Sequence, residues 1–517
     1  MESTMNAVEM RGITKRFGSV LANDHVSLDI RRGEILSLLG ENGSGKTTLT
    51  NMLSGIYFPD EGEIRVNGEV VTIRSPKDAY GLGIGMIHQH FKLVELFTAA
   101  ENIILGLPGS TRLNLKSVTE KIMALADQYG FRIDPNKKVY DMSVSEKQTV
   151  EIVKMLFRGA DILILDEPTA VLTPQETDRL FDVLRNMRAD GKAIVIITHK
   201  LQEVLSLSDR VTILRKGQYI DTVDTKDATE MMLTEMMVGK KVSLDIEHPE
   251  PKNCEKRLAI RNLTVMNKYG VPAIDNVSFD AYSGEILGIA GIAGSGQKEL
   301  LEAIAGLQDS ERGSVVYTAP NGAEPTELIG KNAQNIRDLG VALSFVPEDR
   351  LGMGLVGSMG VAGNMMLRSY RRGHSLLADR KTPRILAEEV IAELEVAVPD
   401  VETSVKKLSG GNVQKILVGR EIAANPTVLM MAYAVRGLDI NTSYTIYRLL
   451  NEQKERGTAV IYVGEDLDVL LELCDRILVL CGGRVSGIVD TKTATKEEVG
   501  LLMTKLTEGG AGDGKKD

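Results

Sequence analysis

Short apolar runs recur through the first half of the chain, and all but the first end in polar side chains. They occupy residues 33–39, 85–91, 160–167 and 192–199. An uninterrupted apolar run is typical of a central parallel strand buried on both faces. Helical periodicity predicts helices over residues 48–53, 98–105, 115–129 and 145–156. We therefore expect an α/β domain that carries a helical insert.

This pattern occurs twice along the chain. The run LANDHVSLDIRRGEILSLLGENGSGKTTL returns as AIDNVSFDAYSGEILGIAGIAGSGQKEL. Gly40 corresponds to Gly291 (291 − 40 = 251) and Asp166 to Ala432 (432 − 166 = 266), so the second copy contains a modest insertion between these points. A single repeat of this length indicates a duplicated domain rather than a solenoid. We expect domains at residues 6–240 and 257–506, a polar linker at 241–256 that includes HPEPKNCEK, and a disordered tail at 507–517.

A glycine-rich stretch, GENGSGKTT, lies between the first predicted strand and the first predicted helix. It fits the phosphate-binding pattern G-x-x-x-x-G-K-[ST] in the strand–loop–helix context that the motif requires. Its backbone N–H groups and the helix N-terminus favour a phosphate, Lys46 is expected to reach the β- and γ-phosphates, and the Thr47 hydroxyl to bind Mg²⁺. An ordinary glycine-rich turn is the alternative for the pattern alone. The predicted nucleotide-binding residues of this loop are Gly40, Glu41, Asn42, Gly43, Ser44, Gly45, Lys46, Thr47 and Thr48.

Polar side chains follow the other predicted strands, where they would face the ligand crevice of an open α/β sheet. Asp166 is expected to hold Mg²⁺ through water, and Glu167 to orient and deprotonate the attacking water. Gln89 could contact Mg²⁺ or that water, or be a loop glutamine. His199 is expected to hydrogen-bond the γ-phosphate, with a structural histidine as the alternative. Phe17, before the first strand, is either an adenine-stacking residue or a core residue. The predicted catalytic residues are Glu167, His199 and Gln89, and the predicted metal ligands are Thr47, Gln89 and Asp166.

Composition narrows the class of protein. The 517 residues have a net charge of −10 and a pI of about 5.4, so there is no global basic surface for nucleic acid. Cys254, Cys474 and Cys481 form no CxxC pair, which suits a reducing cytosol and argues against a zinc site. The sequence shows neither an apolar signal region nor a run of 18 apolar residues. We expect a chain that acts at a membrane, if at all, through partners.

The order of motifs resembles the ATP-binding cassette family over residues 8–505. The resemblance rests on the phosphate loop, DEPTA from Asp166, ITH ending at His199, and LSGGN from Leu408 in the second half. It implies an α/β fold of two tandem P-loop ATPase domains, each with a RecA-like mixed-sheet core and a helical signature subdomain. It also implies ATP and Mg²⁺ as cofactors, and two cassettes that face each other head to tail. ATP bound at one phosphate loop would then contact Ser409, Gly410 and Gly411 of the other cassette, at a helix start suited to phosphate.

Head-to-tail pairing would make the two composite sites unequal. The second cassette has Gln297 at the position of the loop lysine and Ala432 and Tyr433 at the positions of DE. It has Glu348 at the position of the glutamine and Glu465 at the position of the histidine. Lys298 follows Gln297, but one residue along a helix start turns a side chain about 100° away. The first cassette's signature, Met142 to Glu146, reads MSVSE and lacks the paired glycines. We expect one hydrolytic site and one that does not hydrolyse ATP; random decay of a redundant copy is the alternative.

VPEDR, from Val346 to Arg350, resembles the fused ATPases of bacterial monosaccharide and nucleoside importers, and HQHF and DEPTAVLTPQE resemble the nucleoside branch. This resemblance implies a peripheral ATPase at the cytoplasmic face of the membrane. Two integral-membrane permease subunits would dock in grooves between core and helical insert, and an extracytoplasmic substrate-binding lipoprotein would act indirectly. Monosaccharide import stays open, while a ribosome-associated ATPase or a sensor without turnover is disfavoured by the short non-basic linker and the intact Glu167.

Overall fold

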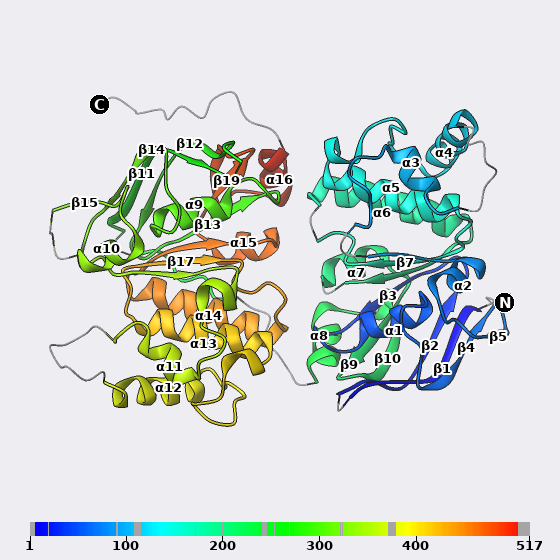
Figure 1. The fold of residues 1–517 in the computed structure, drawn as a ribbon, viewed down its shortest axis with the longest axis horizontal. Helices are drawn as coiled ribbons and strands as arrows, with labels where there is room; N and C mark the ends of the chain where they lie inside the picture. The colour runs from blue at the N-terminus through cyan, green and yellow to red at the C-terminus, as the bar shows by residue number, and fades with distance from the viewer. Residues whose placement is uncertain are drawn as a thin grey trace. The chain divides into compact units, whose positions relative to one another are not determined.

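The computed structural model describes residues 6–18, 20–88, 91–107, 115–170, 172–198, 200–239, 246–252, 254–267, 269–320, 322, 324–370 and 379–504. The chain divides into two compact units, Met1–Ser243 and Leu244–Asp517. Each contains two sheets and a set of helices (Figure 1). The tail predicted at 507–517 lies outside the described residues.

The first unit contains a six-stranded sheet beside a smaller antiparallel one. The small sheet has the order β2-β1-β4-β5, formed by β1 (Asn6–Phe17), β2 (Val20–Arg31), β4 (Glu61–Val66) and β5 (Glu69–Val71). The large sheet has the order β10-β9-β3-β8-β7-β6, formed by β3 (Ile35–Leu39), β6 (Ile84–Ile87), β7 (Ile162–Asp166), β8 (Ala193–Ile197), β9 (Arg210–Arg215) and β10 (Gln218–Asp224). Only β10 pairs antiparallel in the large sheet, which is therefore mixed. The four strands predicted from apolar runs are β3, β6, β7 and β8.

Helices cover the large sheet and form a separate insert. The core helices are α1 (Lys46–Leu53), α2 (Pro76–Gly81), α6 (Pro174–Ala189), α7 (Leu201–Leu207) and α8 (Glu230–Val238), with the 3-10 turn η2 (Thr225–Asp227). The insert contains α3 (Ala99–Ile104), α4 (Leu115–Tyr129), η1 (Val139–Asp141) and α5 (Val144–Phe157). The insert has its own apolar cluster, in which Ile103, Ile122 and Val153 are fully buried. The predicted helical insert is thus confirmed.

The second unit repeats this architecture. Its small sheet has the order β12-β11-β14-β15, formed by β11 (Lys256–Met266), β12 (Pro272–Tyr282), β14 (Arg312–Tyr317) and β15 (Thr326–Glu327). Its large sheet has the order β16-β17-β18-β13-β19-β20, formed by β13 (Ile286–Gly291), β16 (Leu343–Val346), β17 (Val428–Ala432), β18 (Ala459–Val463), β19 (Arg476–Cys481) and β20 (Arg484–Asp490). The remaining elements are α9 (Gln297–Ile304), α10 (Ala333–Asp338), the π-helical turn η3 (Arg350–Gly354), α11 (Val361–Met366), α12 (Lys381–Glu393), η4 (Val405–Lys407), α13 (Gly410–Ala423), α14 (Ile440–Glu455), α15 (Leu467–Leu473) and α16 (Lys496–Thr504).

Strand register aligns the two units residue by residue. Ile84 pairs with Ile162 in the first unit, and Leu343 pairs with Val428 in the second. The same register continues across each large sheet, so that β6 corresponds to β16 and β7 to β17. Glu348, two residues after β16, therefore occupies the position of Gln89. The duplication predicted from the repeated segment is confirmed in three dimensions.

Part of the predicted linker packs on the second unit. Ile246 contacts that unit's apolar core, and the carbonyl oxygen of Glu247 accepts a hydrogen bond from Asn451. His248 Nε2 lies 3.0 Å from Asp475 Oδ1. The described residues 246–252 are thus attached to the second unit by apolar and polar contacts.

Candidate functional site

The phosphate loop of the first unit connects the end of β3 to α1. Gly45, directly before α1, has a φ of 98°, and a Cβ atom there would lie 2.4 Å from the carbonyl oxygen of Ala22. Glycine alone avoids this clash and adopts the left-handed backbone without strain. The Ser44 hydroxyl is buried and has no hydrogen-bond partner among the described residues. Because an unpaired buried hydroxyl is costly, a phosphate oxygen that accepts its hydrogen would be stabilised here.

Lys46 is the first residue of α1 and is only 7% exposed. Its Nζ donates to the carbonyl oxygens of Gly40 (2.5 Å) and Glu41 (3.0 Å). Burial lowers the pKa of Lys46 to about 8, and the carboxylates of Glu167 and Asp166 oppose that shift. The structure therefore brings the lysine of the loop within electrostatic reach of both acids that follow the apolar strand β7.

The two acids occupy the carboxyl end of β7. Burial, and then the charge of Glu167, raise the pKa of Asp166 to about 6, while Lys46 lowers it. Glu167 has a φ of 47°, and its N–H donates to the carbonyl oxygen of Ile197 at 2.8 Å. A left-handed glutamate is uncommon, and such backbone is frequent at functional sites. The exposed Thr47 hydroxyl and the Asp166 carboxylate supply the oxygen donors that Mg²⁺ prefers.

Side chains behind β7 hold the loop that follows Glu167. Gln148 Nε2 donates to the carbonyl oxygen of Pro168 at 2.7 Å. The Thr169 hydroxyl donates to Glu203 Oε2 at 2.6 Å, and Lys200 forms an ion pair with the same carboxylate group at 3.0 Å. The loop after β7 is thus fixed from two sides by contacts that the sequence did not predict.

Phe17, Gln89 and His199 are the remaining predicted site residues of the first unit, and the structure describes only Phe17. Phe17 ends β1, is 43% exposed, and packs edge-on against Tyr57 with ring centroids 5.1 Å apart. The core alternative for Phe17 is therefore wrong, and its ring is accessible to a ligand. Gln89 and His199 lie outside the described residues.

The two signature segments both begin helices. Ser409 is the N-cap of α13, which starts at Gly410, and Ser143 is the N-cap of α5, which starts at Val144. Glu146 completes a capping box with Ser143, so its side chain and backbone N–H are both engaged. The residue at the same position after Ser409 is Asn412, whose amide donates to the Ser409 hydroxyl at 2.9 Å, and the two residues between them, Gly410 and Gly411, have no side chains. This difference supports the predicted assignment of a phosphate-binding signature to the second unit.

The second unit preserves the shape of the phosphate loop but not its chemistry. Gly296 has a φ of 92° and precedes α9 as Gly45 precedes α1. Gln297 occupies the lysine position, is 3% exposed, and donates to the carbonyl oxygen of Ile292 at 3.3 Å. Lys298 is exposed, with its Nζ 3.8 Å from Glu302, so the predicted rotation away from the loop is confirmed. Tyr433 has a φ of 52°, the backbone conformation of Glu167, without a carboxylate.

Two arginines that sequence reasoning missed join the strand ends of the second unit. Arg436 Nη1 lies 2.7 Å from Glu348 and its Nε lies 3.2 Å from Glu465. Arg350 donates to the carbonyl oxygen of Arg436, and its Nη1 lies 3.5 Å from the carbonyl oxygen of Gly410. We call these four residues, Arg350, Arg436, Glu348 and Glu465, the arginine network. The sequence contained one signal for this network: Arg436 is charged, whereas the equivalent residue of the first repeat is Ala170.

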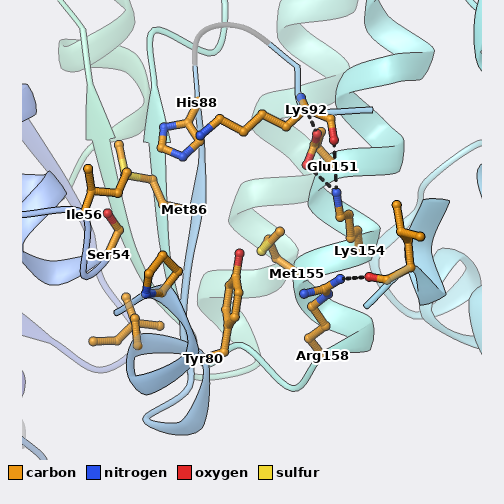
Figure 2. Close-up of a pocket in the computed structure, with 14 residues that line it drawn as sticks. Ser54, Ile56, Tyr80, Met86, His88, Lys92, Glu151, Lys154, Met155 and Arg158 are labelled. Carbon is orange, nitrogen blue, oxygen red and sulfur yellow. Dashed lines mark hydrogen bonds and ion pairs between the residues drawn. The ribbon is translucent and has the colours of Figure 1, made fainter. Parts of the chain in front are cut away.

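A cavity of about 220 Å³ lies between the core of the first unit and its helical insert (Figure 2). The core contributes Ser54, Ile56, Pro76, Ala79, Tyr80, Ile84, Met86 and His88, and the insert contributes Lys92, Leu105, Glu151, Lys154, Met155 and Arg158. Lys154 Nζ lies 3.6 Å from Glu151, and Arg158 donates to the carbonyl oxygen of Leu105 at 2.6 Å. Burial, and then the charge of Lys92, lower the pKa of His88. The wall formed by the insert carries three cationic side chains, Lys92, Lys154 and Arg158, and one carboxylate, Glu151, so positive charge predominates.

The part of the chain that the structure describes contains neither a membrane-spanning helix nor a cluster of metal-binding side chains. None of its helices is long and apolar enough to cross a membrane. Within those same residues, no group of three or more His, Cys, Asp or Glu side chains could hold a metal ion. Asp166 could supply one carboxylate to a Mg²⁺ ion, a metal that commonly also takes phosphate and water ligands.

Comparison with known proteins agrees with this geometry. The ABC transporter family matches residues 23–170 and 274–431, once in each unit. The nucleoside import ATP-binding protein NupA of Lactococcus lactis subsp. cremoris is 42% identical over 96% of this chain and 97% of its own length. The guanosine import ATP-binding protein NupO of Bacillus subtilis is 41% identical over 98% of both chains, and the glucose import ATP-binding protein TsgD13 of Haloferax volcanii is 40% identical over 96% and 95%. With both cassettes matched and relatives aligned over their full length, the chain belongs to the ABC transporter family and is one of its ATPases.

Proposed function

We propose that this chain is the ATP-hydrolysing subunit of an importer for a nucleoside or a related simple sugar. The buried Lys46, held beside Asp166 and Glu167 at the end of β7, carries the hydrolytic part of this proposal. Full-length relatives named for nucleoside, guanosine and glucose import support the transport part. The two most similar of these three act on nucleosides, so we favour a nucleoside over a monosaccharide such as ribose or glucose.

In the proposed reaction, the phosphate loop and Lys46 bind the β- and γ-phosphates of ATP, and Phe17 stacks on the adenine. Thr47, Asp166 and Gln89 would hold a Mg²⁺ ion, which would supply positive charge beside the phosphates. Glu167 accepts a proton from the attacking water, and His199 hydrogen-bonds the γ-phosphate. Ser409, Gly410 and Gly411, at the start of α13, are proposed to donate to the γ-phosphate of ATP. The second phosphate loop is proposed not to support hydrolysis.

The cavity of the first unit is the proposed docking place for one of two integral-membrane permease subunits. It lies between the core and the helical insert, so a change in their relative position would act on a bound permease segment. A separate extracytoplasmic substrate-binding lipoprotein would deliver the solute, and the chain would act peripherally at the cytoplasmic face of the membrane. No contact with nucleic acid is proposed.

The hydrolytic assignment is tested by Glu167→Gln, with Tyr433→Phe as the matched variant in the second unit. Losing the general base should reduce ATP turnover by about 10²-fold or more while ATP binding is retained. Tyr433→Phe should leave turnover unchanged. Wild-type turnover in Glu167→Gln would refute the assignment. The transport assignment is tested by measuring which nucleosides and monosaccharides the cognate binding protein retains, and retention of monosaccharides alone would replace nucleoside by sugar.

A further inference from the structure

The arginine network connects the ends of three neighbouring strands of the large sheet in the second unit. Glu348 follows β16, Arg436 follows β17 and Glu465 follows β18. In the first unit the corresponding positions are Gln89, Ala170 and His199, where the γ-phosphate and its metal are proposed to bind. A guanidinium between two carboxylates thus stands where the first unit would hold Mg²⁺ and phosphate.

The network also reaches the signature segment. Arg350 contacts the carbonyl oxygens of Gly410, at the start of α13, and of Arg436, after β17. The strand register aligns Arg350 with Phe91 of the first unit, and Arg436 aligns with Ala170. Both arginines of the network therefore occur only in the second unit. The planar fork of arginine can donate to several acceptors at once, which a lysine cannot reproduce.

The contacts that hold the catalytic loop in the first unit are missing from the second. Thr169 and Glu203 correspond to Val435 and Val469, which cannot form that hydrogen bond. Gln148 corresponds to Gln414, whose buried amide has no partner among the described residues. The second unit has therefore lost one set of loop contacts and gained another that reaches the LSGGN segment.

We propose that the arginine network takes the place of a bound nucleotide in the second unit and holds the LSGGN segment in position for contact with the γ-phosphate of ATP. Arg350 and Arg436 act as positioning residues and contact neither ATP nor the attacking water. This inference rests on the proposed function, in which Ser409 to Gly411 contact that γ-phosphate.

The test uses the full chain with Glu167→Gln, so that ATP is bound without being hydrolysed. Affinities for Mg-ATP and Mg-ADP are measured for this parent and after adding Arg350→Ala or Arg436→Ala. Each substitution should weaken Mg-ATP binding about fivefold, the effect of one lost contact of this kind, and leave Mg-ADP binding unchanged because ADP has no γ-phosphate. The double variant should lose little more than either single variant, since both residues belong to one network. Arg436→Lys should recover part of the loss.

Two controls separate the possible failures. Arg448→Ala removes an exposed arginine paired with Glu452 on α14, outside the network, and should change neither affinity. Ser409→Ala should weaken Mg-ATP binding selectively. If it does so while Arg350→Ala and Arg436→Ala behave like Arg448→Ala, the network proposal is wrong. The proposed contact of Ser409 with the γ-phosphate then stands. Equal losses of ATP and ADP affinity would also overturn the network proposal, because they indicate general damage. If Ser409→Ala has no effect, the proposed contact of Ser409 with the γ-phosphate is refuted, and the network inference is refuted with it.

Discussion

At the scale of single residues, the two units differ most at the first position of the helix after the phosphate loop. Lys46 and Gln297 are both buried and both donate to carbonyl oxygens of their own loops. An ammonium can exchange those carbonyls for phosphate oxygens and gain a charge-assisted bond, whereas an amide gains only a neutral one. The nearby acids Asp166 and Glu167 help keep Lys46 charged despite its burial.

Replacing Lys46 by Ala should therefore lower the ATP turnover rate by about 10² to 10³-fold, because a preorganised positive charge at the phosphates is lost. Lys298→Ala removes a lysine that is one residue past the equivalent position and exposed to solvent. It should leave turnover unchanged. Steady-state phosphate release by the two variants provides the comparison, and equal losses would show that Lys298, too, acts on phosphate.

At the scale of secondary-structure elements, one buried ion pair is present in both units and ties the start of the central strand to its neighbour. Arg210 of β9 donates to both carboxylate oxygens of Glu34, before β3, at 3.0 and 2.9 Å. In the second unit Arg476 of β19 donates to Glu285 at 3.1 and 2.8 Å. Its presence in both units, only one of which has the catalytic residues, indicates a structural role.

Arg210→Met should destabilise the first unit by about 3 kcal/mol, because it leaves the buried Glu34 carboxylate without its cation. The double variant Glu34→Gln with Arg210→Met should be less destabilised than Arg210→Met alone. Hydrogen exchange of the β3 and β9 amides measures the effect locally. A loss below about 0.5 kcal/mol would mean that the pair is effectively solvated.

At the scale of the whole molecule, one chain contains two copies of a fold, and only the first copy has the lysine and the two acids that we propose for hydrolysis. Both copies have a residue with left-handed backbone directly after equivalent strands of the large sheet, Glu167 after β7 and Tyr433 after β17. The second unit thus has the same backbone conformation without the carboxylate, and the arginine network joins its strand ends.

The full chain should therefore hydrolyse ATP at one site. Vanadate added during turnover is expected to trap about one ADP per chain, because only the first unit has the lysine and the carboxylates that support the transition state. Glu167→Gln should trap none. Two equivalents of trapped ADP per wild-type chain would contradict the asymmetry between the units.

Much of the fold was predictable because its signals are local. The apolar runs that became β3, β6, β7 and β8 are buried on both faces, and continuous runs of this kind have few other uses. The glycines around Lys46 predicted the loop because its backbone excludes a Cβ atom. The duplication followed from direct comparison of the two halves, and strand register confirmed it.

The sequence alone determined the two domains, the phosphate loop, the acids at the end of β7 and the loss of those groups from the second unit, because each is encoded by neighbouring residues. Only the tertiary structure decided which distant side chains meet. It brought Asp166 and Glu167 within reach of Lys46, left the ring of Phe17 exposed, and joined Arg350 and Arg436 to acids from two other strand ends. Contacts of this kind depend on sheet order and register, which no short stretch of sequence contains.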